Sequence, residues 1–336
     1  MKALIRVPGG VEVAEQPDPV ASPEEVVVAV HSCGICGSDV HAAEANTGES
    51  HGIPGHEFSG TVADIGRDVS GWRVGQPVAV NPLGGCGQCE WCQREMLIRC
   101  TGRPNLGLSA PGGFAEYVAA HHSQLFAVPE GMPLECGSRV EPTAVGLRAI
   151  REAGSPAGLN AIVFGVGPIG LFLIQGLRAL GAGTIIAVGR SSAGRKAAAA
   201  RIGADVVLDS RETDVADYVA EREIEVAQAY ECSADPQALV VLGRAVRGAG
   251  SIVMVALPRE PVYVDARRLV TGGQHLVGAC AFGAQDYAQS LELISSGKVN
   301  VEPLISERLP LAAAPEAFVR LRHPGDLVSV LVQPGL

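Results

Sequence analysis

The sequence predicts an α/β protein with two domains, a β-rich first domain and a second domain built on a doubly wound parallel sheet. Residues 1–140 contain short apolar runs separated by Gly and Pro, without sustained helical periodicity, which is typical of irregular β structure. From about residue 143, apolar strand signals alternate with amphipathic helix signals. This alternation indicates a parallel sheet with helices on both faces.

The first domain, residues 1–144, is predicted from three buried strands. Residues 26–30 are continuously apolar and mostly β-branched, and residues 60–65 and 76–80 are similar in character. β-branched side chains favour the pleated surface of a sheet. The glycine-bounded segment 66–71 between the last two strands is predicted to be a turn.

The second domain, residues 145–282, is predicted from regular alternation. It follows an amphipathic helix that extends through Arg151. Strands are expected at 161–165, 184–188, 206–208, 225–232, 251–257 and 275–281, and helices at 169–180, 192–202 and 237–247. The remaining residues, 283–336, contain a helix at 286–296, a helix after Pro315 and a strand near 327–332.

The composition limits the possible classes of function and partner. Hydrophobic residues make up 47% of the 336 residues and charged residues 18%, as in ordinary globular proteins. A net charge of −10 argues against nucleic acid or an anionic membrane as a partner. The N-terminus lacks the apolar core of a signal peptide and no run reaches membrane-spanning length, which predicts a cytoplasmic protein.

Nine cysteines are present, and six of them fall in two tight groups, which favours metal ligation over disulfides. In one group, Cys86, Cys89, Cys92 and Cys100 are spaced as ligands of a structural zinc ion, within a lobe at about 84–102. Four thiolates close a tetrahedral cage and leave no position for substrate. An iron–sulfur cluster is the competing interpretation, but the spacing and following proline usual for one are absent.

A second set of residues has the chemistry of an open, catalytic zinc site. Cys36 lies in a glycine-containing stretch, His56 and Glu57 follow a proline-containing turn, and Glu141 precedes Pro142. Cysteine, histidine and carboxylate ligands with water in the fourth position are the pattern of catalytic zinc. Pro142 is expected to be the first residue of the following helix.

The alternative is that these residues have no common role. An isolated His-Glu pair is usually exposed and without function, and Cys33 and Cys36 could both be thiols of the core. Ser38 and His41 lie in the same stretch as Cys36 and add a hydroxyl and an imidazole. The presence of a cofactor-binding motif elsewhere in the chain favours the functional interpretation.

That motif is a glycine fingerprint for a dinucleotide, between a predicted strand and a predicted helix. It consists of Gly165, Val166, Gly167, Pro168, Ile169 and Gly170. The first glycine makes the tight turn, the second lets the backbone approach a pyrophosphate, and the third lets the helix pack on the strand. The helix N-terminus then faces the phosphates. A glycine-rich turn without a ligand is the less favoured alternative.

The end of the next strand favours NADP(H) over NAD(H). An NAD site usually has an acidic residue there that binds the ribose hydroxyls, but this chain has Gly189, Arg190 and Ser191. Gly189 leaves room, and the guanidinium of Arg190 matches the geometry of a 2′-phosphate. Arginine could instead stack on adenine, which is compatible with either nucleotide.

Over essentially its full length the chain resembles the zinc-containing medium-chain dehydrogenase/reductase family. Within that family it is most similar to the polyol (sorbitol-like), threonine and butanediol dehydrogenases. The motifs that carry the resemblance are residues 36–39, 55–57, the four-cysteine lobe, residues 140–142 and the fingerprint at 165–170.

The resemblance implies a GroES-like catalytic domain, a Rossmann domain and a return of residues 283–336 to the catalytic domain. It implies a catalytic zinc on Cys36 and His56, with a carboxylate from Glu57, from Glu141 or from exchange between them. It also implies a second, structural zinc in the lobe and assembly as dimers or tetramers.

The resemblance further implies that Ser38 and His41 relay a proton through the nicotinamide ribose, and that Val145 packs against the nicotinamide. Arg195 fits a basic position common in the family and is counted as cofactor-binding, although it carries no information on NADP. Many members have an acid where Arg190 stands, so cofactor identity rests on the local residues.

The expected function is reversible oxidation of a secondary or polyol-like alcohol. Only 4% of the residues are aromatic, and the segment 42–51 lacks the aromatic residues of an apolar pocket, which favours a polar substrate. A rival within the same fold is an NADPH-dependent reductase of an activated carbonyl or imine. A remote alternative is a non-catalytic zinc- or nucleotide-binding protein.

Overall fold

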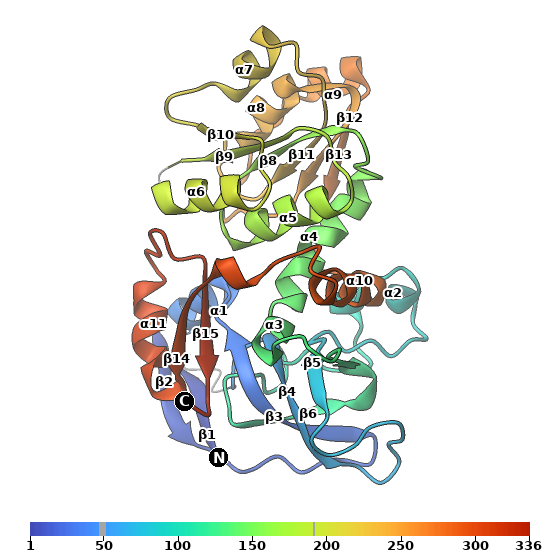
Figure 1. Cartoon of the computed structure of the whole chain (residues 1–336), viewed down its shortest axis with the longest axis vertical. Helices are drawn as coiled ribbons and strands as arrows, with labels where there is room; N and C mark the ends of the chain where they lie inside the picture. Colours follow the sequence, from blue (N-terminus) through green and yellow to red (C-terminus); the bar gives the residue numbers. More distant parts are fainter. Residues whose placement is uncertain (47–51, 191) are drawn as a thin grey trace. The chain divides into compact units, whose positions relative to one another are not determined.

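The computed structural model describes residues 1–46, 52–190 and 192–336. They form two compact units, labelled by element in Figure 1. The first unit contains Met1–Glu141, Gly283–Ser295 and Leu304–Leu336, and the second contains Pro142–Phe282 and Ser296–Pro303.

The first unit is built on a seven-stranded sheet. Six strands follow the order β14-β15-β3-β4-β5-β7, and β6 pairs with β3. A separate antiparallel hairpin joins β1 (Lys2–Val7) to β2 (Gly10–Glu15). The sheet strands are β3 (Glu25–Gly34), β4 (Glu57–Ile65), β5 (Pro77–Val80), β6 (Tyr117–His121), β7 (Leu125–Ala127), β14 (Ile305–Pro310) and β15 (Ser329–Gln333).

Short helices connect these strands. They are α1 (Gly37–Ala45), α2 (Glu90–Gln93), α3 (Leu134–Gly137), α10 (Ala284–Ser295) and α11 (Ala314–Arg320). The first 140 residues show no sustained helical periodicity in the sequence, yet they contain α1, a nine-residue helix. Its polar composition hides it: of its apolar residues only Val40 and Ala43 are buried, so no amphipathic period is visible.

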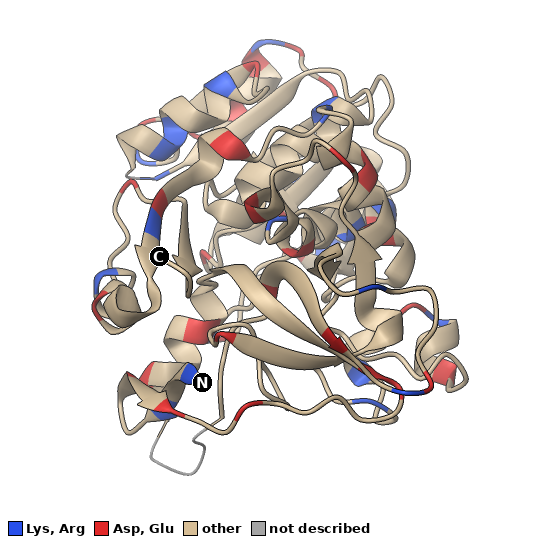
Figure 2. Ribbon diagram, turned by 60° about the horizontal axis from the view of Figure 1, so that its bottom comes forward, with Lys and Arg blue, Asp and Glu red and all other residues tan. Residues whose placement is uncertain are grey.

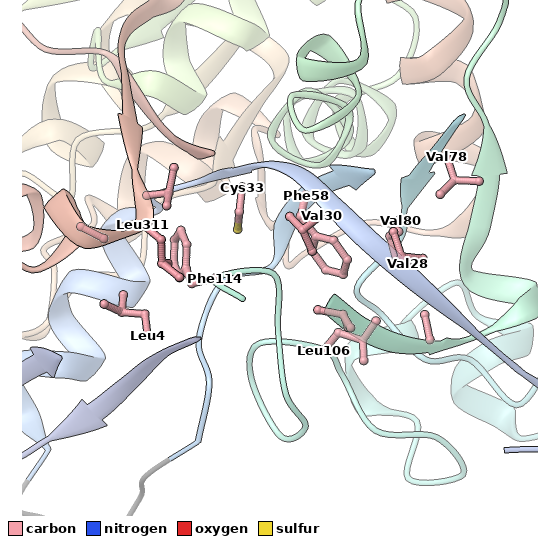
Figure 3. Packing of buried hydrophobic residues seen from close by; sticks show 14 of the residues in the cluster. Leu4, Val28, Val30, Cys33, Phe58, Val78, Val80, Leu106, Phe114 and Leu311 are labelled. Carbon is pink, nitrogen blue, oxygen red and sulfur yellow. The ribbon is translucent and has the colours of Figure 1, made fainter. Parts of the chain in front are cut away.

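The core of the first unit lies under β3 and β4 (Figure 3). Cys33 is fully buried there, and its sulfur points into the core between Phe114 and Phe58. Cys33 therefore acts as a small apolar side chain. Burial raises the pKa of its thiol well above the usual value, so Cys33 stays protonated.

The second unit confirms the predicted parallel sheet. Its six strands are all parallel, in the order β10-β9-β8-β11-β12-β13. The order reverses between β8 and β11, where open α/β sheets bind their ligands. The strands are β8 (Asn160–Phe164), β9 (Ile185–Gly189), β10 (Val206–Asp209), β11 (Val226–Glu231), β12 (Val246–Met254) and β13 (His275–Gly278).

Helices cover both faces of this sheet. Figure 1 shows α5 (Pro168–Ala179) and α6 (Ala193–Arg201) on one face. The other face carries α7 (Val215–Glu221), α8 (Ala238–Ala245) and α9 (Ala266–Gly272). Helices α7 and α9 are not expected from the sequence, because each has only seven residues and too few turns to show a period.

Helix α4 (Val140–Ala153) connects the first unit to the second along the chain. It begins at Val140, so the prediction that Pro142 is the first helical residue was wrong by two positions. Pro142 still lies in the first turn, where its missing N–H removes no intrahelical hydrogen bond. The earlier start places Glu141 on the helix itself.

Acidic and basic residues are interspersed over the visible elements in Figure 2, without a continuous basic stripe in that view. Among the described residues, no helix is both long enough and apolar enough to cross a bilayer.

Candidate functional site

Strand register brings the predicted catalytic ligands together. Gly34, at the end of β3, pairs with Glu57, the first residue of β4. Cys36 follows β3 by two residues and His56 precedes β4, so both lie at the same edge of the sheet. Ligand atoms of Cys36, His56 and Glu57 all lie within 4.8 Å of one another.

A capping box fixes the position of Cys36. Cys36 is the N-cap of α1, and its side chain accepts from the backbone of Asp39 while the Asp39 carboxylate accepts from the Cys36 N–H at 3.2 Å. The same carboxylate accepts from Gly55 N–H at 3.4 Å and lies 3.5 Å from Nδ1 of His56. Asp39 thus ties the start of α1 to the loop that carries His56.

Gly55 is required for this approach. Its backbone has φ +98°, a left-handed conformation that favours glycine. A Cβ atom there would lie 2.7 Å from the sulfur of Cys33 and 2.8 Å from the ring of Phe114. Any side chain at this position would push the His56 loop away from the core.

The chemistry of the three ligands fits a zinc ion. They offer sulfur, nitrogen and oxygen, the donor set of an open zinc site. Nδ1 of His56 is buried and has no hydrogen bond to any described residue. Burial raises the pKa of the Cys36 thiol, although His56 opposes this, and a bound cation would reverse that shift by favouring the thiolate.

Without a metal, the charge on His56 depends on Asp39. Burial alone would lower the pKa of His56, but Asp39 and Cys36 together raise it well above the usual value. Zinc binding therefore requires proton release from both Cys36 and His56.

Glu141 lies near this cluster but is not one of its three close ligands in the described part of the chain. Its side chain is buried. Burial raises the pKa of Glu141 to about 8, with a further increase from Glu57, while His56 and Arg139 oppose it. Of the two carboxylates proposed as ligands, the structure places Glu57 in the cluster and Glu141 beside it.

The metal-free protein is expected to lose stability as pH rises from about 5 to 8. In that window native Glu141, with a pKa of about 8, holds a proton that the unfolded residue, with a pKa near 4.5, releases. One such group changes the unfolding free energy by on the order of 1 kcal/mol per pH unit. Glu141→Gln should make the decrease in stability with rising pH less steep. The measurement is Tm as a function of pH in the presence of a chelator.

The remaining slope in that variant would come from His56, whose raised pKa also favours the native state at low pH. A Glu141→Gln protein with the same pH slope as the wild type would contradict a buried, proton-holding Glu141.

Ser38 and His41 lie on α1, three residues apart, and both are exposed. Residues at this spacing share one face of a helix. Nδ1 of His41 lies 3.6 Å from Glu44, which is also 3.1 Å from Nε of Arg322. The two relay candidates therefore face solvent on the side of α1 away from Val40 and Ala43.

The four lobe cysteines also converge. Their sulfur atoms lie within 4.8 Å of one another, with Cys89 and Cys92 3.6 Å apart. None of the nine cysteines, all of which lie in the described residues, forms a disulfide. The backbone N–H groups of Cys86 and Gly102 both donate to the sulfur of Cys100, at 3.3 and 3.4 Å.

These hydrogen bonds prepare the lobe for a metal. Backbone N–H groups of Gln88 and Cys89 lower the pKa of the Cys86 thiol to about 6, because they stabilise the thiolate. The four converging sulfurs fit a tetrahedral zinc ion with no free position.

The glycine fingerprint has the predicted local structure. Gly165 has φ +117° and follows β8, and a Cβ atom on Gly170 would lie 1.9 Å from the Gly165 carbonyl oxygen. A Cβ on Gly167 would meet nothing within 4 Å, so space remains in front of the N-terminus of α5. Pro168 is the first residue of that helix and Ile169 is the second. Val166 lies between Gly165 and Gly167, the N-cap.

A cavity of about 510 Å³ lies within the second unit, beyond the ends of the parallel strands. Arg190 and Arg211 line it, together with Asp235 and residues of the segment 210–215. Its volume falls in the range of small-molecule sites. The Arg190 side chain is 74% exposed, and its nearest acid is Asp235 at 3.7 Å.

Arg211 is held in place by Asp209, the last residue of β10. The guanidinium makes two hydrogen bonds to Asp209, at 3.0 and 2.8 Å, and Lys196 binds the same carboxylate. These cations hold the pKa of Asp209 well below its usual range. One carboxylate therefore holds two cations beside the cavity.

The absence of a side chain at Gly189 also serves packing within the unit. A Cβ there would lie 2.8 Å from both the Lys196 stem and Val166, so the glycine makes room for packing. Ser191 lies outside the described residues. Arg195 is in the first turn of α6, where its N–H donates to the hydroxyl of the N-cap Ser192 at 3.0 Å.

Val145 lies one turn beyond Glu141 on α4 and is half-buried. Sequence reasoning missed two residues of the site, Asp39 and Arg139. An acid three residues after a cysteine N-cap is a signal that could have identified Asp39. No sequence pattern identified Arg139, whose partners Glu57 and Ser329 are distant along the chain.

Comparison with known proteins identifies both halves of the chain. Residues 22–130 match the model of the alcohol dehydrogenase GroES-like domain, and residues 168–296 match that of the zinc-binding dehydrogenase domain. The chain is 32% identical to the (R,R)-butanediol dehydrogenase of Neisseria gonorrhoeae, over 98% of each chain.

Solved structures agree. Galactitol-1-phosphate dehydrogenase of Escherichia coli is 28% identical and superposes with a TM-score of 0.92, covering 99% of this chain and 100% of that one. A zinc-binding dehydrogenase of Sinorhizobium meliloti bound to NADP is 27% identical with a TM-score of 0.90, covering 99% of each.

Proposed function

Because the chain belongs to the zinc-type alcohol dehydrogenases of the medium-chain dehydrogenase/reductase family, we propose that it interconverts a polyol-like or other secondary alcohol and its ketone with NADP(H). The family membership makes it a zinc-dependent enzyme that acts on alcohols with a nicotinamide cofactor. The observation that carries the specific proposal is the convergence of Cys36, His56 and Glu57 in one unit, with a dinucleotide fingerprint in the other.

In this proposal Cys36, His56 and Glu57 hold the catalytic zinc, and Asp39 orients His56. A zinc ion there supplies Lewis acidity, which polarises the substrate oxygen and makes the alcohol proton easier to remove. Asp39 receives hydrogen bonds from two backbone N–H groups, so its position does not depend on the metal. A carboxylate beside a ligand histidine fixes the ring orientation and strengthens its donor nitrogen.

Ser38 and His41 carry the alcohol proton away from the site. Their shared, exposed face on α1 supports this role, because a relay must end in solvent. The imidazole of His41 is the exposed basic group of this pair and can pass a proton to water. General base assistance of this kind contributes about 10²- to 10⁴-fold.

The N-terminus of α5 and the space at Gly167 support binding of the cofactor pyrophosphate. The bound nicotinamide supplies the hydride acceptor. Arg190 and Arg211 line one cavity, and a second guanidinium beside the first supports a preference for the 2′-phosphate of NADP. A structural zinc in the lobe brings the proposed total to two per chain.

A substrate screen tests this function. We expect the zinc-loaded enzyme to oxidise polyols, cyclitols or diols with NADP⁺, and to reduce the matching ketones with NADPH. Arg190→Ala should lower kcat/KM for NADP⁺ about 10- to 100-fold, the loss of one charge-assisted hydrogen bond, and leave NAD⁺ within a few-fold.

Arg201→Ala provides the control, since Arg201 is an exposed arginine at the end of α6. A wild-type preference for NAD⁺ would overturn the cofactor proposal. No turnover of any alcohol or ketone, by protein with two zincs and bound cofactor, would overturn the substrate proposal.

A further inference from the structure

Arg139 is a fully buried arginine beside the proposed metal ligands. Its side chain is 2% exposed. Nη1 lies 2.8 Å from Oε2 of Glu57 and donates to the hydroxyl of Ser329 at 2.7 Å, while Nε donates to Ser138 at 3.2 Å. A guanidinium cannot lose its proton in a protein, so a buried one requires an anion. Glu57 supplies that anion.

The surrounding backbone leaves space for this ion pair. A Cβ atom on Gly34 would lie 1.6 Å from Nη2 of Arg139 and 2.4 Å from Oε2 of Glu57. Gly34 and Glu57 are paired residues of β3 and β4. The ion pair therefore occupies the space that any side chain at position 34 would take, and the sheet register holds the two residues in place.

Glu57 is at the same time one of the three residues whose ligand atoms converge. A carboxylate has two oxygens, and the guanidinium takes one of them. A metal ligated by Glu57 would then use the other oxygen, Oε1, and the negative charge of the carboxylate is partly neutralised by Arg139. Both effects weaken Glu57 as a ligand: it can bind through one oxygen only, and it is more easily displaced.

We propose that Arg139 is a positioning residue that restrains Glu57 to one-oxygen, displaceable metal ligation and so keeps a coordination position open for substrate. The inference deepens the proposed function, on which it rests. It also gives Glu57 a role of its own among the two carboxylates that the sequence left equivalent, because Arg139 forms an ion pair with Glu57.

The test is the absorption spectrum of cobalt(II) in the catalytic site. Cobalt(II) replaces zinc in both sites, and the spectrum of a Cys36→Ser protein supplies the lobe background for subtraction. Wild-type protein should show the intense bands of four-coordinate cobalt. Arg139→Gln should show weaker bands, because Glu57 is then free to bind through both oxygens.

Metal affinity, measured by chelator competition, is a second readout. The two possible roles of Arg139, positioning and merely structural, predict changes in metal affinity of opposite direction when Arg139 is replaced. Removing a cation next to the metal and freeing a carboxylate should tighten metal binding, by about 10-fold on the scale of outer-shell effects. A merely structural Arg139 would loosen metal binding when replaced. Turnover by Arg139→Gln should fall because the open position is filled.

Arg139→Lys retains the charge and should restore most of the wild-type spectrum. Ser329→Ala, which removes a different partner of Arg139, is the matched control and should leave the spectrum unchanged. Weak bands in the wild type, or an Arg139→Gln protein with an unchanged spectrum and unchanged or looser metal binding, would overturn the inference. An Arg139→Lys protein with bands as weak as those of Arg139→Gln would also overturn it. A wild type whose Cys36 site takes up no metal would instead overturn the proposed function.

Discussion

Cys36→Ser is expected to lower kcat by about 10³-fold or more while the protein stays folded and still binds its cofactor. The metal supplies several kcal/mol of transition-state stabilisation, and each 1.36 kcal/mol is a factor of ten. Serine is a poor zinc ligand because its hydroxyl is not ionised at neutral pH. Metal analysis should fall from near two zinc ions per chain to near one.

Cys33→Ser is the matched control for that variant. Cys33 lies three residues away and is also buried, but its sulfur belongs to the core and not to the ligand cluster. It should keep both metal ions and most of the activity, at some cost in stability from a hydroxyl in an apolar site. A Cys36→Ser protein that turns over at the wild-type rate would refute the site.

Cys100→Ser is expected to remove the structural zinc and unfold the lobe before the rest of the protein. The lobe contains little regular structure, with α2 only four residues long and η1 (Leu97–Arg99) three. A segment of this kind cannot bury enough apolar surface to fold by itself. In zinc-dependent modules the metal contributes about 10 kcal/mol or more of folding free energy.

Limited proteolysis and metal analysis measure this effect. New cleavage should appear within residues 84–102, zinc content should fall by one per chain, and Tm should decrease. The lobe also contacts α10, since a Cβ on Gly283 would lie within 3.0 Å of atoms of Glu95, so the damage should spread to that helix. Cys280→Ser, at an exposed cysteine, is the control and should change none of these. A Cys100→Ser protein with two zincs and an intact lobe would contradict the proposal.

Some of the fold could be predicted because the signals are local. Alternating strands and helices specified the parallel sheet, and Gly165 and Gly170 specified the turn that a strand and a helix require. The four-cysteine spacing is equally local, because a single short segment supplies all the ligands. In each of these cases neighbouring residues along the chain are also neighbours in space.

Other features depended on contacts between distant residues. Helix α1 escaped the sequence interpretation because it is stabilised by the Cys36–Asp39 capping box and by core packing, rather than by an amphipathic pattern. The packing at Gly189 was hidden for a similar reason, since the Lys196 stem that contacts it comes from the next helix.

The sequence by itself determined the fold class, the family and the residues available to bind two metal ions and a dinucleotide. It could not distinguish Glu57 from Glu141, because both carboxylates have the same chemistry. The tertiary structure places the two carboxylates differently: the pairing of β3 with β4 and the absence of a side chain at Gly34 place a permanently charged Arg139 against Glu57. Strand pairing brings Gly34 and Glu57 together, and the contacts of Arg139 add residues 139 and 329. These positions are far apart along the chain, so only folding brings them together.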